Sequence, residues 1–204
     1  MDQGNTAFVL ISAALVLLMT PGLAFFYGGM VKAKSVVSMM MLSFGSLGLI
    51  GVLWVLYGYA IAFSNGGSKT FIGIDGWFGI DTSFIGLNAQ VADALDPQGA
   101  YPSLAFVAFQ ATFAIITVAL ISGAIADRAK FGAWMVFAGI WATIVYFPVA
   151  NWVFNFGADG SGKNGGWLVA MGVHDFAGGT AVHINAGAAG LALALVLGKR
   201  FGFS

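Results

Sequence analysis

The chain has 204 residues, of which 59% are hydrophobic and only 8% are charged, whereas a soluble domain carries about 25% charged residues. This composition excludes an ordinary soluble domain and indicates a protein embedded in a lipid bilayer. The formal net charge of zero argues against a nucleic-acid partner, and the lack of cysteine excludes a disulfide framework or a thiolate metal site.

Hydropathy predicts five membrane-spanning helices, each long enough for a hydrocarbon core of about 30 Å. In chain order they cover Thr6–Met30, Ser35–Phe63, Ser103–Ala126, Phe131–Phe156 and Asp175–Leu197. Pro21 should kink or loosen the first helix, and the second is long enough to tilt. We therefore expect a single all-α, polytopic membrane domain over residues 1–204.

Basic residues mark one side of this predicted domain. The flank before the first helix, MDQGNTA, has no Lys or Arg, so we interpret that helix as retained rather than as a signal peptide. Most basic residues then fall on one side, which the positive-inside rule makes cytoplasmic. They are Lys32, Lys34, Arg128, Lys130, Lys199 and Arg200. The prediction is a multi-pass protein of the cell membrane, with its N-terminus outside and the end of this chain in the cytoplasm.

The opposite, outer side carries most of the aspartates and a long segment from Ser64 to Pro102 that is rich in Gly and Asp. We expect this segment to fold partly over the outer mouth. Its acidity either concentrates cations near a vestibule or reflects topology and solubility alone, and the second interpretation is the simpler.

The fifth predicted helix contains His183 well inside an apolar stretch. A histidine at membrane depth is costly and usually lines a pathway or holds a ligand; the alternative is a structural histidine bonded to a neighbouring helix. On an α-helix, small Gly and Thr residues would share its face and leave room for a narrow lumen or a close helix. Asp175 is predicted as an N-cap or as part of an outer cation site, and Asn185 as an interhelical hydrogen-bond partner.

Aromatic residues line the third and fourth predicted helices. Phe106, Phe109 and Phe113 are spaced i, i+3 and i+7, which predicts one aromatic stripe. Such a stripe is usually core packing; otherwise it is a constriction whose ring faces attract a cation by about 0.5–2 kcal/mol. Trp152 and Phe154 close the fourth helix, where aromatic residues often meet the membrane interface.

Three segments carry a resemblance to the ammonium transporter (Amt/MEP/Rh) family. AFQATFAIITVALISGAIADR at 108–128 resembles the third helix of that family, DFAGGTAVHINAGAAG at 175–190 its fifth and PGLAFFYGG at 21–29 its first. Their order and spacing also fit, and the resemblance covers essentially the whole chain. It implies an eleven-helix fold of two inverted five-helix halves, of which this chain resembles the first.

The resemblance also assigns roles to individual side chains. Phe109 and Phe154 match an outer site that recruits ammonium, and Phe113 matches a phenylalanine gate below it. His183 matches a lumen histidine implicated in proton handling, and Asp175 matches a structural aspartate that organises the outer site. The family often has tryptophan at the position of Phe154, so a weaker or differently shaped outer site is expected here.

The partners follow from the same resemblance. It implies transport of ammonium or ammonia across the bilayer by a homotrimer with one pore per subunit, without a cofactor or metal ion, and a cytoplasmic regulatory protein is a further candidate. The second lumen histidine and gate phenylalanine of the family belong to the half that is not in this sequence. We expect a fragment of a longer protein rather than a split product that needs a separate partner.

Three other functions stay open from the residues. An ammonium sensor has the same fold, and a non-transporting structural bundle has the same hydropathy. An enzyme has less support, because no H-E-x-x-H or other catalytic motif occurs, and the two histidines at 174 and 183 would face opposite sides of a helix.

Overall fold

The computed structural model describes the chain except for residues 1, 65–69, 75–76, 93–99, 158–159, 161–162, 164 and 201–204. Within the described residues, five helical spans of 19 to 30 residues are long and apolar enough to cross a membrane. They are Gln3–Gly29, Ala33–Ala62, Ser103–Ile125, Phe131–Phe154 and Gly179–Leu197. The five predicted spans and the all-α class are therefore confirmed, and the largest difference is at the start of the fifth.

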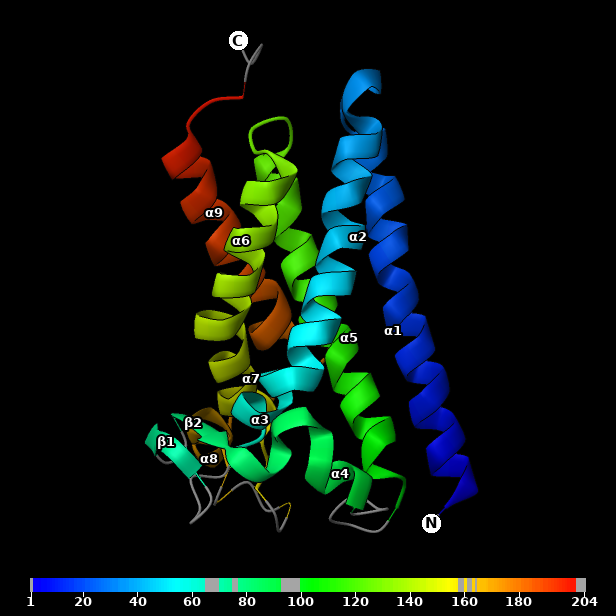
Figure 1. Cartoon of the computed structure of the whole chain (residues 1–204), viewed down its shortest axis with the longest axis vertical. Coiled ribbons are helices and arrows are strands. Elements are labelled where there is room, and N and C mark those ends of the chain that lie inside the picture. The colour runs from blue at the N-terminus through cyan, green and yellow to red at the C-terminus, as the bar shows by residue number, and fades with distance from the viewer. Residues whose placement is uncertain are drawn as a thin grey trace.

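The spans lie side by side, with alternating direction (Figure 1). The first is α1 (Gln3–Gly29), which continues through Pro21 as one helix. The remaining spans contain α2 (Val36–Leu53) and α3 (Tyr59–Ala62), α5 (Ser103–Ile121), α6 (Phe131–Trp141) and α7 (Phe147–Phe154), and α9 (Asn185–Leu197). α1 begins at the end that holds the β-hairpin, and α9 ends at the opposite end (Figure 1).

Three of these spans include a π-helical segment, in which the backbone hydrogen bonds reach five residues back. The segments are Trp54–Gly58, Ala142–Tyr146 and Gly179–Ile184. In the fourth span the π segment comes just before Pro148, which has no N–H to donate and therefore interrupts a regular α-helix. Short 3₁₀ turns begin the second span at Ala33–Ser35 and end the third at Ser122–Ile125.

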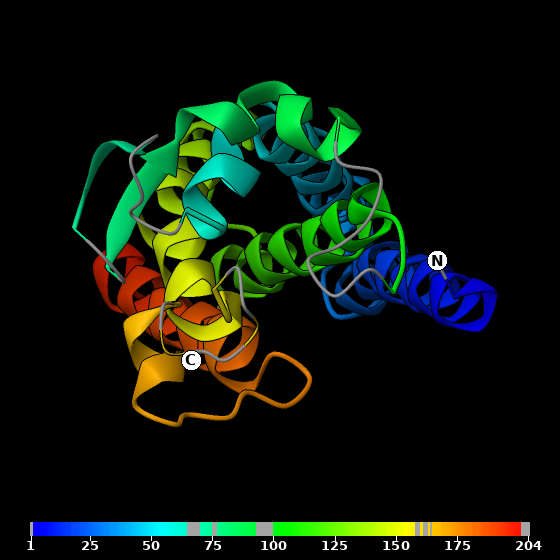
Figure 2. The ribbon, with the colours of Figure 1, turned by 90° about the horizontal axis from the view of Figure 1, so that it is seen from below.

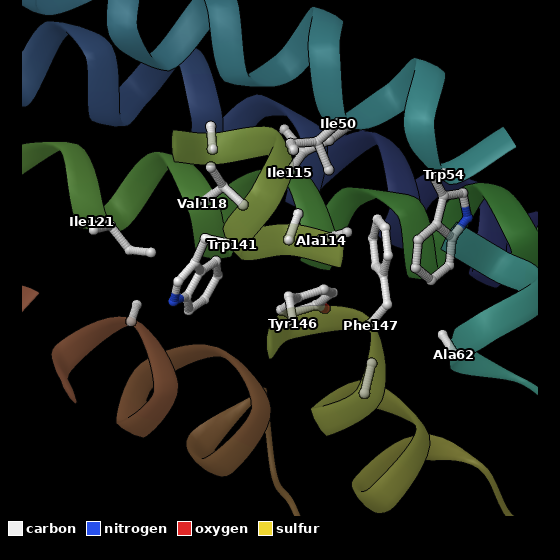
Figure 3. Packing of buried hydrophobic residues seen from close by; sticks show 14 of the residues in the cluster. Ile50, Trp54, Ala62, Ala114, Ile115, Val118, Ile121, Trp141, Tyr146 and Phe147 are labelled. Carbon is white, nitrogen blue, oxygen red and sulfur yellow. The ribbon is translucent and has the colours of Figure 1, made fainter. Parts of the chain in front are cut away.

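α5 is the central helix of the bundle. Most of its side chains are buried, and it contacts α1, α2 and α9 (Figure 2). Large aromatic side chains fill the core around it, and Figure 3 shows Trp54, Phe147 and Tyr146 among them. The Nε1 of Trp54 donates to the carbonyl of Val107 at 3.1 Å, so the buried indole N–H is satisfied.

α1 and α9 are the two flanks of the bundle and expose many large apolar side chains. Phe8 on α1 is 72% exposed, and Val196 on α9 is 83% exposed. In a bilayer such faces contact lipid tails or another helix at little cost, since hydrocarbon is as apolar as leucine.

The segment between the second and third spans lies across the ends of α3, α5 and α7 (Figure 1). Its strands β1 (Thr70–Ile74) and β2 (Phe78–Asp81) pair antiparallel, and a 3₁₀ helix (Thr82–Leu87) and α4 (Asn88–Ala92) follow. The Oδ1 of Asp81 accepts a hydrogen bond from the N–H of Ser83 at 2.9 Å and so caps the 3₁₀ helix. α8 (Trp167–Ala170) lies at the same end, after the fourth span.

Candidate functional site

Three of the predicted site residues lie together near the hairpin end of the bundle. The ring centroids of Phe109 and Phe113 are 4.9 Å apart in a T-shaped arrangement, and those of Phe113 and Phe154 are 6.2 Å apart. All three side chains are partly buried. α5 and α7 thus present a half-open aromatic group of the kind that attracts a small cation through its ring faces.

Phe106 does not join this group, and it packs in the core, which is the usual role of such a stripe. Its ring lies 5.1 Å from that of Phe63 and 6.5 Å from that of Tyr101, in the core between the second and third spans. Phe106 and Phe113 share a helix face but are two turns apart. Phe63, which follows the last residue of α3, covers that face at the level of Phe106.

The side chain of Trp152 also points away from this aromatic group, as is expected for a residue two positions from Phe154 on the same helix. Its Nε1 donates to the carbonyl of Trp77, and its ring is 6.1 Å from that of Trp77 and 5.8 Å from that of Trp167. Trp77 and Trp167 stack with centroids 4.5 Å apart. The three tryptophans join the hairpin segment to α7 and α8, and Phe154 is left as the α7 aromatic beside Phe113.

Phe113 links the aromatic group to the fifth span. It packs against a small buried cluster that includes Ile116 of α5 and Val182 of the fifth span. Val182 directly precedes His183, whose side chain is exposed on the surface of this chain. The aromatic group and the histidine are therefore connected through one buried side chain.

The helical turn that carries His183 is π-helical. The N–H of His183 donates to the carbonyl of Gly178, five residues back, at 2.9 Å. Gly178 has φ +78°, and a Cβ there would lie 2.5 Å from Val182, so the turn requires glycine. The α-helical wheel used to place small residues beside His183 therefore does not apply across this turn.

Asn185 is not the interhelical partner that the sequence predicted. Its Nδ2 donates to the carbonyl of Ala181, four residues back on its own helix, at 3.3 Å. Within the described residues this hydrogen bond stays inside the fifth span and does not join it to another helix.

Asp175 lies in the loop before the fifth span, four residues ahead of its first helical residue. Its Oδ2 accepts hydrogen bonds from the N–H groups of Thr180 and Ala181, both at 2.9 Å. It therefore accepts hydrogen bonds from free N–H groups at the start of the helix, as an N-cap does. Its negative charge also lies at the positive end of the helix dipole. Its Oδ1 is buried and has no hydrogen-bond partner among the described residues.

Tyr146 is a polar residue that the sequence reasoning overlooked. Its fully buried hydroxyl lies beside Thr117 and within electrostatic reach of Asp175, and it has no hydrogen-bond partner in the described part of the chain. Buried polar groups nearly always have partners, so the hydroxyl of Tyr146 and the Oδ1 of Asp175 belong to a small set of unpaired buried polar atoms among the described residues. The sequence signal that could have found Tyr146 is a hydroxyl group in the middle of an apolar span.

The metal-ligating side chains are dispersed. Within the described residues, no group of three or more His, Cys, Asp or Glu side chains comes together. His174 precedes the fifth span, and its ring is 6.4 Å from that of Phe176.

Comparison with known proteins decides the family. Residues 7–204 match the model of the Ammonium Transporter Family. The chain belongs to this family. The ammonium transporter of Mycobacterium tuberculosis (strain ATCC 25618 / H37Rv) is 57% identical over 212 residues, which cover 99% of this chain and 44% of that relative. The ammonium transporter of Bacillus subtilis (strain 168) is 48% identical over 200 residues, covering 98% of this chain and 45% of that relative.

Solved structures of the family have the same fold. Candida albicans Mep2 matches with a TM-score of 0.80 at 33% identity, over 98% of this chain and 40% of that one. Saccharomyces cerevisiae Mep2 matches with a TM-score of 0.77 at 31% identity, over 98% of this chain and 42% of that one. The chain is a multi-pass membrane protein of the ammonium transporter fold. It spans less than half the length of the curated relatives it matches, and these are named as transporters rather than enzymes.

Proposed function

We propose that this chain forms one half of the pathway of an ammonium transporter in the cell membrane. The observation that carries the proposal is the aromatic group of Phe109, Phe113 and Phe154, joined through Val182 to the span that bears His183. A cation-attracting surface and an ionisable side chain at membrane depth are the two elements that a pathway for a small cation needs.

In this proposal ammonium is attracted outside by the ring faces of Phe109 and Phe154. It then passes Phe113, which acts as the gate. Beyond the gate it shares or loses its proton near His183 and moves on as ammonia, and the proton crosses in parallel through the hydrogen-bond relay, so that one positive charge crosses the membrane with each ammonia. Because an apolar lumen disfavours a charged imidazole, His183 acts as a neutral hydrogen-bond relay. Asp175 holds the start of the fifth span through the N–H groups of Thr180 and Ala181.

The exposure of His183 on this chain supports a role for the second half of the transporter in closing the pathway. On this chain the imidazole is exposed, and the curated relatives are more than twice as long as the matched region. We infer that the rest of the transporter faces His183 and closes the lumen, and that the complete protein is a homotrimer. The basic ends of the spans then lie in the cytoplasm, and the hairpin segment lies outside.

The test is ammonium-driven current in liposomes that contain the full-length protein. His183→Ala should lower the current about tenfold or more, equal to about 1.4 kcal/mol on the barrier, because the relay is lost. Asn185→Ala is the matched control, since within the described residues the hydrogen bond of that side chain is to its own helix, and it should keep the wild-type current.

Two results would count against the proposal in different ways. A wild-type protein that binds ammonium but gives no current would contradict transport and favour a sensor. A His183→Ala protein with wild-type current and selectivity would contradict the relay while leaving transport intact. Thermal unfolding of each variant checks that the fold is retained.

A further inference from the structure

A tyrosine and a threonine join the π segments of the second and fourth spans. The hydroxyl oxygens of Tyr57 and Thr143 are 2.9 Å apart. The hydroxyl of Thr143 already donates to the carbonyl of Gly139, four residues back on its own helix, at 2.7 Å. A hydroxyl group has one hydrogen but can still accept, so Tyr57 is the donor in this pair. A threonine bonded to its own helix thus serves as an acceptor for a tyrosine of another span.

A second pair of the same two residue types lies one turn from the proposed gate. The Oγ1 of Thr117 donates to the carbonyl of Phe113, four residues back on α5, at 2.5 Å. Tyr146 ends the π segment of the fourth span, which contacts α5, and its hydroxyl lies beside Thr117. Both side chains are fully buried. The donor of Thr117 is therefore occupied, and its oxygen can accept from the tyrosine.

The hydroxyl of Tyr146 needs such an acceptor. In the conformation seen here it has no hydrogen-bond partner among the described residues, which is unfavourable for a buried donor. Thr117 lies beside this hydroxyl, whereas Asp175 acts on it through its charge alone. The pair of Tyr57 and Thr143 shows the completed contact. A small shift of α5 against the fourth span brings the second pair to the same geometry.

The two helices that meet at this pair carry all three rings of the aromatic group. Phe109 and Phe113 are on α5, and Phe154 ends the fourth span. The 6.2 Å between the ring centroids of Phe113 and Phe154 is a distance between two spans. It therefore depends on how α5 is fixed against the fourth span. A hydrogen bond between Thr117 and Tyr146 would fix the two helices close to the level of Phe113.

We propose that Tyr146 donates a hydrogen bond to Thr117 and that this bond holds Phe113 in place, so that the gate admits ammonium in preference to larger cations. Thr117 and Tyr146 act through Phe113 and do not touch the cation, which makes them positioning residues. The inference rests on the proposed transport function and adds to it a basis for selection by size. Methylammonium is the probe, since it is larger than ammonium by one methyl group.

The experiment compares methylammonium and ammonium currents in liposomes that contain the full-length protein. Thr117→Val keeps the shape and removes the hydroxyl, so it should raise the ratio of methylammonium to ammonium current about threefold or more. The half-saturating ammonium concentration should change less than about twofold, because the outer rings remain. Thr117→Ser restores the hydroxyl and should restore the wild-type ratio. Tyr146→Phe should match Thr117→Val, and the double variant should exceed neither, since both single variants lose the same bond.

Thr143→Val is the matched control. It removes the same kind of contact from the fourth span, on the side that bonds Tyr57, and it should leave the current ratio unchanged. A ratio raised equally by Thr143→Val would overturn the proposal, because general loosening of the bundle would then explain it. A wild-type ratio in Thr117→Val, or additive effects of Thr117→Val and Tyr146→Phe, would also overturn it.

Failure of transport itself has a different result. A wild-type protein that gives no ammonium current would contradict the proposed function and leave the hydrogen bond to be tested by stability. Thermal unfolding of the same single and double variants in detergent provides that test. The two losses in Tm should be less than additive if Tyr146 and Thr117 are bonded, and additive losses would show that they are not.

Discussion

Phe154 occupies the position at which the family resemblance led us to expect tryptophan. Its ring is 6.2 Å from that of Phe113, and the side chain is partly exposed. Phenylalanine attracts a cation less strongly than an indole and lacks the indole N–H. The proposed outer site should therefore hold ammonium more weakly than it would with tryptophan.

Phe154→Trp should strengthen the outer site. A gain of about 0.5–1 kcal/mol in cation–π attraction corresponds to a two- to fivefold lower half-saturating ammonium concentration. Current in liposomes over a range of ammonium concentrations measures it. Phe156→Trp is the control, because Phe156 is 51% exposed and lies beyond the end of α7. Equal shifts in both variants would place the effect outside the aromatic group.

The contacts of individual side chains were predictable only where the family resemblance named their neighbours. The resemblance brought Phe109, Phe113 and Phe154 to one place, and the structure has their rings in contact. Periodicity alone could not tell that Phe106 packs against Phe63 of another span instead of joining the other two rings of its helix. It also failed at Asn185, because an amide can bond along its own helix as well as across to another.

At the scale of helices, the π segment of the second span is held by a close approach to the fourth. A Cβ at Gly58 would lie 2.6 Å from Cζ of Phe147, so the ring occupies the space that only glycine leaves. Phe147 is fully buried, and its ring centroid is 5.7 Å from that of Trp54 (Figure 3). The ring is therefore packed on several sides and has little room to move away.

Gly58→Ala should destabilise the fold by about 1–3 kcal/mol, because the added methyl group overpacks Phe147. Thermal unfolding in detergent would record this as a lower Tm, at about 2–4 °C per kcal/mol. Gly48→Ala is the matched control on α2, since a Cβ there meets nothing within 4 Å. Its Tm should stay the same or rise slightly, and a similar loss in both variants would contradict the packing argument.

Hydropathy predicted the spans well because their lengths are set by the thickness of the bilayer. It could not predict the π segments, which depend on packing between spans and, in the fourth span, on Pro148. The fifth span begins after Asp175 because Gly178 adopts a left-handed conformation there, which apolarity does not reveal. The β-hairpin of the connecting segment was missed for the same reason, since its strands are short and lie outside the membrane pattern.

At the scale of the whole molecule, two arginines attach the end of the fifth span to the loop between α5 and α6. Arg128 donates to the carbonyls of Ala124 and Gly198, and Arg200 pairs with Asp127. Apart from the π turn that precedes it, α9 mainly contacts α5 and the 3₁₀ turn that ends the third span. It exposes much of its surface. These polar contacts are therefore important for the position of its end.

The attachment through Asp127 should depend on pH. Hydrogen bonds from Ser35 and then from Arg200 lower the pKa of Asp127 below its usual value of 3.8. A lowered pKa means that the ionised form stabilises the folded state, fully above about pH 4 and progressively less as the pH falls through the lowered value. The contact is exposed, so high salt should also weaken it.

Spin labels at Lys130→Cys and Lys199→Cys measure this attachment, because the chain has no cysteine of its own. The distance distribution between the labels should be narrow at pH 7 and should broaden below about pH 4, while circular dichroism confirms that the helices remain. Asp127→Asn should give the broad distribution already at pH 7 and respond little to acid, since the charge is gone. A wild-type distribution that stays narrow at pH 3 would show that Arg128 alone holds the end of α9 in place.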